Sequence, residues 1–406
     1  MRLDKRAAFA VPLLIVMSPL AFGQAQVSSN AFNPAISLIL NGRYTSYSLD
    51  PEGYRLPGFL LEEEAGLPSE GLSLDETELA VSANIDDKFY GSLSASIEQT
   101  NGETSGELEE AFFETLALPK GFKVKAGKFL SDIGYLNPIH AHAWDFADAP
   151  LAYVAMLDGG FSDTGVQGRW LAPTTLFLEV GAELFAGDTF PAANGADSNG
   201  TGAWTTFAHV GGDVGTTSSW RAGLSYQEAD ANGRVSSFGV DPDVSTAVFT
   251  GSSELTIADF VWKWAKNGNP RDRYYVVQAE YLHRKEDGAV ELALPVPVIV
   301  NGDYAGTQSG FYVQGVYQFR PRWRAGLRYD RLDASNTVDF LGGPSASFPL
   351  VDDHTPSRES VMVDFSNSEF SRFRLQVNRD DSREQSDDQV VLQYTMSLGA
   401  HGAHRF

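Results

Sequence analysis

Hydrophobic and polar residues alternate along the final segment of the chain. From Val390 to Phe406 the even positions are mostly apolar, whereas the odd positions include Gln393, Thr395 and Arg405. A period of two predicts a β-strand with one face against lipid or a protein core and the other against water. As the edge of a soluble sandwich, so long and apolar a strand would promote aggregation. The pattern therefore favours a sheet that closes into a barrel.

The same alternation recurs upstream and predicts sixteen strands in all. In one of them, Trp323, Ala325 and Leu327 alternate with Arg324 and Arg328. The predicted strands are 35–47, 73–85, 90–99, 108–118, 122–129, 163–171, 175–186, 203–211, 218–228, 254–264, 273–284, 309–319, 323–332, 358–366, 370–379 and 389–406.

Short and long spacers alternate between these strands. Those after even-numbered strands are mostly short, such as 86–88 and 119–121, and the long ones are 48–72, 130–162, 187–202, 229–253, 285–308 and 333–357. Transmembrane barrels combine short periplasmic turns with longer external loops. The sequence thus predicts an all-β chain, a sixteen-stranded antiparallel transmembrane β-barrel with short periplasmic turns and long extracellular loops. A barrel of this size leaves a water-filled lumen, which favours a channel.

The N-terminus has the features of a secretory signal peptide. Arg2, Lys5 and Arg6 precede an apolar stretch, and small residues follow at 21–23. We expect a signal peptide at 1–23, a single outer-membrane barrel domain at 24–406, and a location in the outer membrane of a Gram-negative bacterium.

Composition narrows the chemistry. The 406 residues carry 30 basic and 53 acidic side chains, for a net charge of −23, and include no cysteine. Such a charge argues against nucleic acid as a partner. Without cysteine, disulfides and thiolate metal sites are excluded. The chain has no G-x-S-x-G, phosphate-loop or H-E-x-x-H motif, so we expect no enzymatic activity.

Three segments carry a resemblance to a known family. Residues 118–129 (LPKGFKVKAGKF), 310–317 (GFYVQGVY) and 398–406 (LGAHGAHRF) resemble the phosphate-selective porin O and P family. The resemblance implies a porin that is commonly a homotrimer and lets small hydrophilic or charged solutes diffuse passively. It also implies that the third long loop, about 130–162, folds inward as a constriction.

The charges of that loop depart from a phosphate channel. No basic residue lies between Lys128 and Arg169, whereas Asp132, Asp145 and Asp148 do. Because such a constriction would repel phosphate at close range, we do not expect phosphate selectivity.

The barrel wall is richer in basic residues. Strand parity predicts that eight of them line the pore: Arg43, Lys123, Lys125, Arg169, Arg324, Arg328, Arg372 and Arg374. The same face carries the acidic residues Glu76, Glu78, Glu98, Glu110, Glu114, Glu179, Glu183, Glu280 and Asp330. Two interpretations stay open: either an acidic inward loop faces a basic patch and sets a field across the pore, or these charges pair with one another.

Two histidines in the predicted constriction loop suggest a metal. In an extended segment His140 and His142 lie on one face, and Asp145 and Asp148 follow closely. A divalent cation is therefore the one cofactor that we consider. No third nitrogen ligand is fixed by the sequence, and loop packing or polarity at the pore mouth is the alternative.

Two further functions stay open at this point: a channel linked to a divalent metal such as zinc, and a surface-binding or adhesive barrel that acts through its loops. Loop 48–72 is acidic. It is either simply solvated or binds divalent ions shared with lipopolysaccharide. The expected partners are thus outer-membrane lipid and lipopolysaccharide, small solutes or ions, and further copies of the chain in a trimer.

Overall fold

The computed structural model describes residues 34–62, 65–100, 103–194, 200–238, 244–294, 299–340 and 350–399. The predicted signal peptide lies outside these residues, and so does the end of the predicted last strand, residues 400–406.

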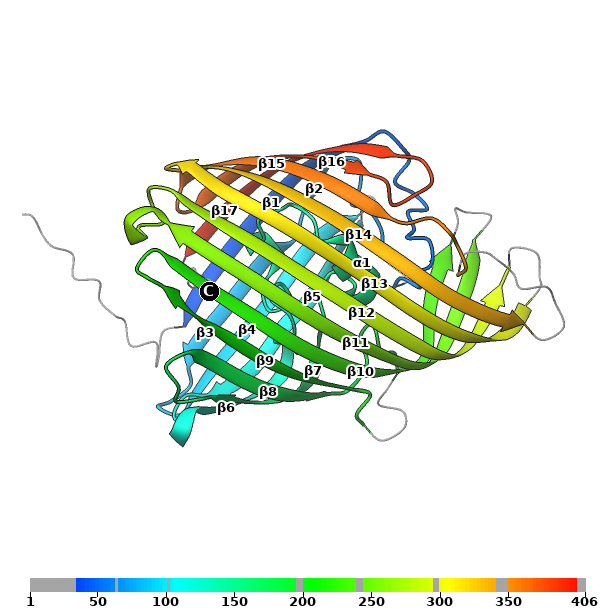
Figure 1. Ribbon diagram of the computed structural model, residues 1–406, viewed down its shortest axis with the longest axis horizontal. Coiled ribbons are helices and arrows are strands. Elements are labelled where there is room, and N and C mark those ends of the chain that lie inside the picture. Colours follow the sequence, from blue (N-terminus) through cyan, green and yellow to red (C-terminus); the bar gives the residue numbers. More distant parts are fainter. Residues whose placement is uncertain are drawn as a thin grey trace, which may run out of the picture.

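All the strands belong to one antiparallel sheet (Figure 1). They are β1 (Ala35–Tyr47), β2 (Gly71–Leu74), β3 (Thr77–Asn84), β4 (Phe89–Thr100), β5 (Glu103–Thr115), β6 (Phe122–Leu130), β7 (Ser162–Leu171), β8 (Phe177–Phe185), β9 (Ala203–Val214), β10 (Ser218–Phe238), β11 (Ser245–Ala265), β12 (Tyr274–Ala293), β13 (Ile299–Arg320), β14 (Trp323–Phe340), β15 (Ser357–Ser368), β16 (Ser371–Asp380) and β17 (Asp387–Gly399).

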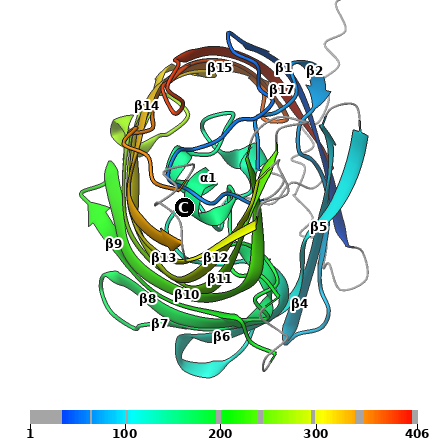
Figure 2. The same ribbon diagram turned by 90° about the vertical axis from the view of Figure 1, so that its right-hand side faces the viewer.

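The sheet closes on itself. β1 pairs with β17 on one side and with both β2 and β3 on the other (Figure 2). Because β2 and β3 are two parts of one interrupted wall strand, the closed barrel has sixteen strands. The predicted fold class is confirmed.

The wall alternates as the sequence predicts. On β16, Phe373, Leu375 and Val377 are exposed on the outside, whereas Arg374 and Gln376 are buried on the inside. A closed barrel with an apolar exterior suits a bacterial outer membrane, and the chain belongs there. Among the described residues, no helix is long and apolar enough to cross a membrane.

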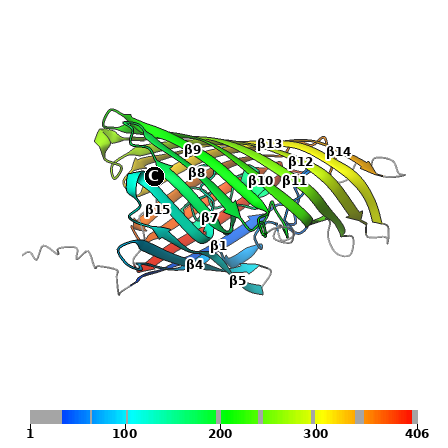
Figure 3. The same ribbon diagram turned by 90° about the horizontal axis from the view of Figure 1, so that it is seen from below.

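Five strands, β10 to β14, run well beyond the others at the end opposite the short turns (Figures 1 and 3). The prediction of long loops at 229–253 and 285–308 is therefore wrong, because most of these residues continue the strands. Of 333–357, residues 333–340 continue β14, and β15 begins only at Ser357. A bulge between Asn232 and Arg234 shifts the alternation in β10. That shift, together with glycine and asparagine typical of turns, hid the strand pattern in the sequence.

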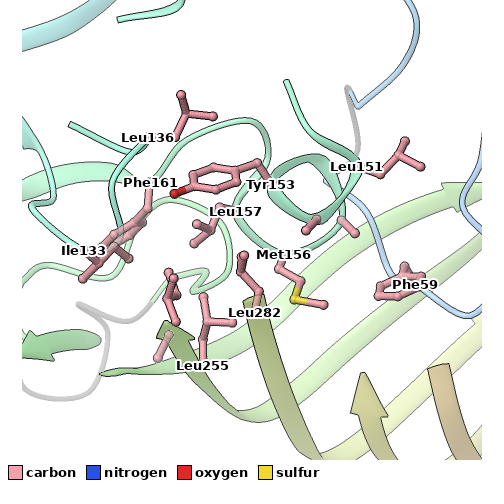
Figure 4. Close-up of a cluster of buried hydrophobic side chains, with 14 of the residues drawn as sticks. Phe59, Ile133, Leu136, Leu151, Tyr153, Met156, Leu157, Phe161, Leu255 and Leu282 are labelled. Atoms are coloured by element: carbon pink, nitrogen blue, oxygen red, sulfur yellow. The ribbon is translucent and has the colours of Figure 1, made fainter. Parts of the chain in front are cut away.

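One sector of the barrel interior is packed with apolar side chains. The helix α1 (Leu151–Leu157) and the segment around Phe59 pack against the barrel wall (Figure 4). Met156 of α1 belongs to one buried cluster with Leu255 and Leu282 of the wall. The expectation of a lumen filled throughout by water is wrong for this sector. The remaining space is shaped by the loop that carries α1.

Candidate functional site: a loop folded into the barrel

The segment 131–161 connects β6 to β7 and lies inside the barrel (Figure 2). It contains a short 3-10 helix (Ala141–Ala143) and α1. Its side chains and backbone contact wall strands on several sides of the lumen. We call this segment the constriction loop.

Wall carboxylates hold the first part of the constriction loop. The backbone N–H of Asp132 donates to Glu183 at 3.0 Å, and those of Tyr135 and Leu136 donate to Glu280 at 3.0 Å each. The Tyr153 hydroxyl also donates to Glu280, at 3.0 Å. Each of these buried carboxylates accepts more than one hydrogen bond from the loop, so together they fix the loop backbone.

The ends of α1 are set locally. Pro150 precedes the first turn, and the free N–H of Leu151 donates to Asp330 on β14 at 3.0 Å. Asp158 ends the helix in the left-handed conformation, with φ 52° and ψ 45°. The next residue, Gly159, donates back to the carbonyl of Tyr153 at 3.1 Å. The seven-residue helix is therefore oriented by the wall as well as by its apolar contacts.

Arginines of the wall hold the second part. Arg324 pairs with Asp145 at 2.7 Å and Arg328 pairs with Asp148 at 2.6 Å. Arg358 pairs with Asp148 at 3.3 Å. The acidic loop and the basic wall thus neutralise each other by direct contact, so for Asp145 and Asp148 the pairing interpretation describes the structure.

Three more predicted wall arginines bind carbonyl oxygens of the constriction loop. Arg372 donates to His142 at 2.9 Å, Arg374 donates to Trp144 at 2.7 Å, and Arg43 donates to Ala147. Arginine carries five donors in a fixed fork, which suits it to several acceptors at once. The wall arginines therefore together hold the loop, and we call this group the arginine clamp: Arg43, Arg324, Arg328, Arg358, Arg372 and Arg374.

Electrostatics at the clamp favour the ionised form of Asp148. Burial alone would raise its pKa, but the guanidinium groups of Arg328 and Arg358 outweigh burial and hold the pKa of Asp148 well below its usual range. Gln376 and Asn378 also donate to this carboxylate, at 2.8 and 2.9 Å. Asp148 is thus bound by two arginines and two amide side chains of the wall.

The other predicted basic residues line the opposite wall. Arg169 pairs with Glu114 at 3.2 Å and with Asp132 at 3.3 Å, and Lys123 pairs with Glu114 at 3.0 Å. Lys125 lies over the ring of Phe129, with its Nζ 4.9 Å from the ring centre. All eight predicted basic residues therefore face the interior.

Among the described residues, five further basic side chains that were not predicted also face the interior: Arg221, Arg234, Lys263, Arg284 and Arg358. Arg221 and Lys263 lie over the ring of Tyr135 in the constriction loop. Strand parity could have identified most of them, because they share the parity of buried polar residues on the same strand, such as Ser225 and Ser360.

The two histidines have different neighbours from those expected. Asp145 and Asp148 are engaged by the arginine clamp, whereas His140 and His142 lie against glutamates of β3 and β5. Burial alone would lower the pKa of His140, but the adjacent carboxylates of Glu109, Glu110 and Glu78 raise it well above its usual value. The expected grouping of these histidines with Asp145 and Asp148 is therefore wrong, because the loop passes from the glutamates of β3 and β5 at residues 140–142 to Arg324 of β14 at Asp145.

Two cavities, of about 1250 and 980 Å³, border the constriction loop. Tyr135, Pro138 and Ile139 line both, so the loop separates them. Both also reach Ser219, at the short-turn end of the barrel. The larger one is lined by aromatic and charged side chains, among them Trp144, Asp145, Lys263, Trp264 and Arg324.

Comparisons with known structures agree with this architecture. OmpT of Vibrio cholerae in its trimer form has a TM-score of 0.54 at 9% identity, covering 90% of this chain and 99% of that one. The outer-membrane channel DcaP of Acinetobacter baumannii has a TM-score of 0.52 at 12% identity, covering 90% of this chain and 96% of that one. OmpF of Salmonella typhi has a TM-score of 0.51 at 12% identity, covering 91% of this chain and 98% of that one. At these identities the likeness shows the fold, that of outer-membrane barrels.

Sequence comparison gives a nearer relative. No family model matches the chain, so the resemblance to the phosphate-selective porin O and P family stays a prediction. An uncharacterized protein of Aquifex aeolicus (strain VF5) is 30% identical over 412 residues, which cover 95% of this chain and 82% of that protein. The chain therefore belongs to the same family as this Aquifex aeolicus protein.

Proposed function

We propose that this protein is an outer-membrane porin through which small hydrophilic or charged solutes diffuse passively. The observation that carries the proposal is the constriction loop itself, which is anchored inside a closed barrel and bordered by two cavities. A loop held this way narrows the lumen, and a narrowed waist is how a passive channel filters by size and charge. Porins and outer-membrane channels are among the folds that the barrel resembles.

Phosphate is a poor candidate for the solute. The wall arginines that would attract an anion already bind Asp145, Asp148 and loop carbonyls. The larger cavity carries both signs of charge, with Lys263 and Arg324 near Asp145. Such a waist suits small polar solutes of either sign better than one selected anion.

We further propose that the barrel assembles as a homotrimer in contact with outer-membrane lipid and lipopolysaccharide. The V. cholerae barrel of similar fold is a trimer, and the exposed apolar exterior of this wall supports lipid contact. Mass measurement of the detergent-solubilised complex checks the trimer, and a monomer mass would contradict it.

Reconstitution into a planar bilayer tests the channel proposal. We expect discrete current steps in potassium chloride, and proteoliposomes that swell in small sugars but not in large ones. A barrel that inserts without conducting would contradict the proposal and favour the surface-binding alternative. Protein denatured before reconstitution is the matched control for adventitious leaks.

A further inference from the structure

Six side chains that can bind metals gather where the constriction loop meets the wall near β3 and β5: Glu76, Glu78, Glu109, Glu110, His140 and His142. His140 Nδ1 lies 3.2 Å from Glu78 Oε2 and 3.3 Å from Glu109 Oε2. His142 Nδ1 lies 3.1 Å from the same oxygen of Glu78. We call this group the glutamate–histidine cluster.

Two irregularities of the wall create the cluster. The first lies between β2 and β3, where the chain takes four residue steps from Leu74 to Glu78 against only three on β1, so it holds one extra residue. The second is a bulge in β5, where Glu110 and Leu108 pair with consecutive residues of β4 and Glu109 between them has no pairing partner in the sheet. A bulge lets two consecutive residues face the same side of a sheet. Glu109 and Glu110 therefore both reach the histidines from one strand.

Acidic side chains outnumber the imidazoles in this cluster. Four carboxylates face two imidazoles, and Lys125 lies near Glu110. Only 5% of Glu78 is exposed. Its Oε2, like Oε2 of Glu109, accepts no hydrogen bond from the described residues, although imidazole nitrogens lie close by. These two oxygens thus lie at ion-pair distance from the imidazoles without a well-directed hydrogen bond, and a cation between them would supply that missing partner.

We propose that Glu76, Glu78, Glu109 and His140 bind one divalent cation of the zinc class. Their nearest ligand atoms all lie within 4.8 Å of one another. Two ligand atoms of a tetrahedral zinc, each about 2.0–2.1 Å from the metal, lie about 3.3–3.4 Å apart. The 3.2 and 3.3 Å separations at His140 Nδ1 fit that geometry.

Glu110 lies on the other side of the His140 ring from Glu78 and Glu109. Its carboxylate lies 3.1 Å from Nε2 of His140, the ring nitrogen on the side away from the other glutamates. A carboxylate in this place fixes the tautomer and orientation of a metal-binding histidine. His140 and Glu110 also line the larger cavity, which gives a cation a route from solvent.

The cation would add a second attachment of the constriction loop, where it meets β3 and β5. The loop would then be held by guanidinium groups near Asp145 and Asp148 and by a metal at His140. This site is independent of the channel proposal, because metal binding does not require that solutes pass.

Calorimetric titration of the folded, EDTA-stripped protein with zinc chloride tests the site. We expect one zinc per chain with micromolar or tighter affinity. Glu109→Gln should abolish saturable binding, and Glu110→Gln should weaken it about 10–100-fold. Glu107→Gln is the matched control and should bind as the unmodified protein does, since Glu107 lies on the same strand but is exposed and pairs with Lys128.

Two results would overturn the site: no saturable zinc binding, or unchanged binding in both Glu109→Gln and His140→Ala. The glutamine variant is nearly isosteric, so the test stands even where the alanine variant folds poorly. Titration in detergent needs no current, so failure of the metal site and failure of the channel are told apart.

Discussion

Replacing residues 143–157 with a short glycine–serine link should raise the single-channel conductance severalfold and shift the selectivity toward anions. The deletion removes α1 from the lumen together with Asp145 and Asp148. It also removes the loop partners of five wall arginines: Arg43, Arg324, Arg328, Arg358 and Arg374. These arginines then keep only partners on the wall, such as Asp75, Asp330 and Asp364. Cations lining a wider pore raise the local concentration of anions.

Single-channel recording and the reversal potential in a potassium chloride gradient measure both effects. A variant shortened at 351–355, between β14 and β15, is the control and should conduct as the unmodified channel does. Unchanged conductance in a deletion variant that retains the barrel would contradict the assignment of the waist to the constriction loop.

Asp148→Ala should release the middle of the constriction loop from the wall. The substitution leaves Arg328 and Arg358 buried with a main partner lost, and removing one member of a buried ion pair costs about 3–5 kcal/mol. Hydrogen exchange should therefore show much lower protection for amides such as Ala147 and Leu151, which donate to Gln376 and Asp330.

Asp272→Asn is the matched control. Asp272 pairs with Lys266 at 3.0 Å in an exposed turn, where an ion pair contributes about 0–1 kcal/mol. Protection of the loop amides should not change in this variant. Equal protection in Asp148→Ala and the unmodified protein would show that the arginine clamp does not fix the loop.

The wall of the barrel was predictable because its physics is local. Alternation on segments such as β16 follows directly from lipid on one face and water on the other. The extensions of β10 to β14 escaped prediction for a local reason as well. In β10 the bulge at Asn232 and Arg234 breaks the alternation. In β12 and β13, pairing to the neighbouring strand overrides the turn preference of residues such as Gly288 and Asn301.

The site was predictable in its residue types but not in its pairings. Parity placed Arg324 and Arg328 inside, yet only the path of the loop across the lumen brings Asp145 and Asp148 to them. For the same reason the histidines meet glutamates from another part of the wall. Glu109 was missed because a bulge, invisible to a strict period of two, turns it inward.

Thiol modification at the waist tests the central claim most directly. The chain has no cysteine, so a single Ala143→Cys places one thiol in the lining of the larger cavity. A bulky, membrane-impermeant methanethiosulfonate should then sharply reduce the current, whereas Leu375→Cys on the exposed outer wall should show no change. An undiminished current through fully modified Ala143→Cys would contradict a water-filled path past the constriction loop.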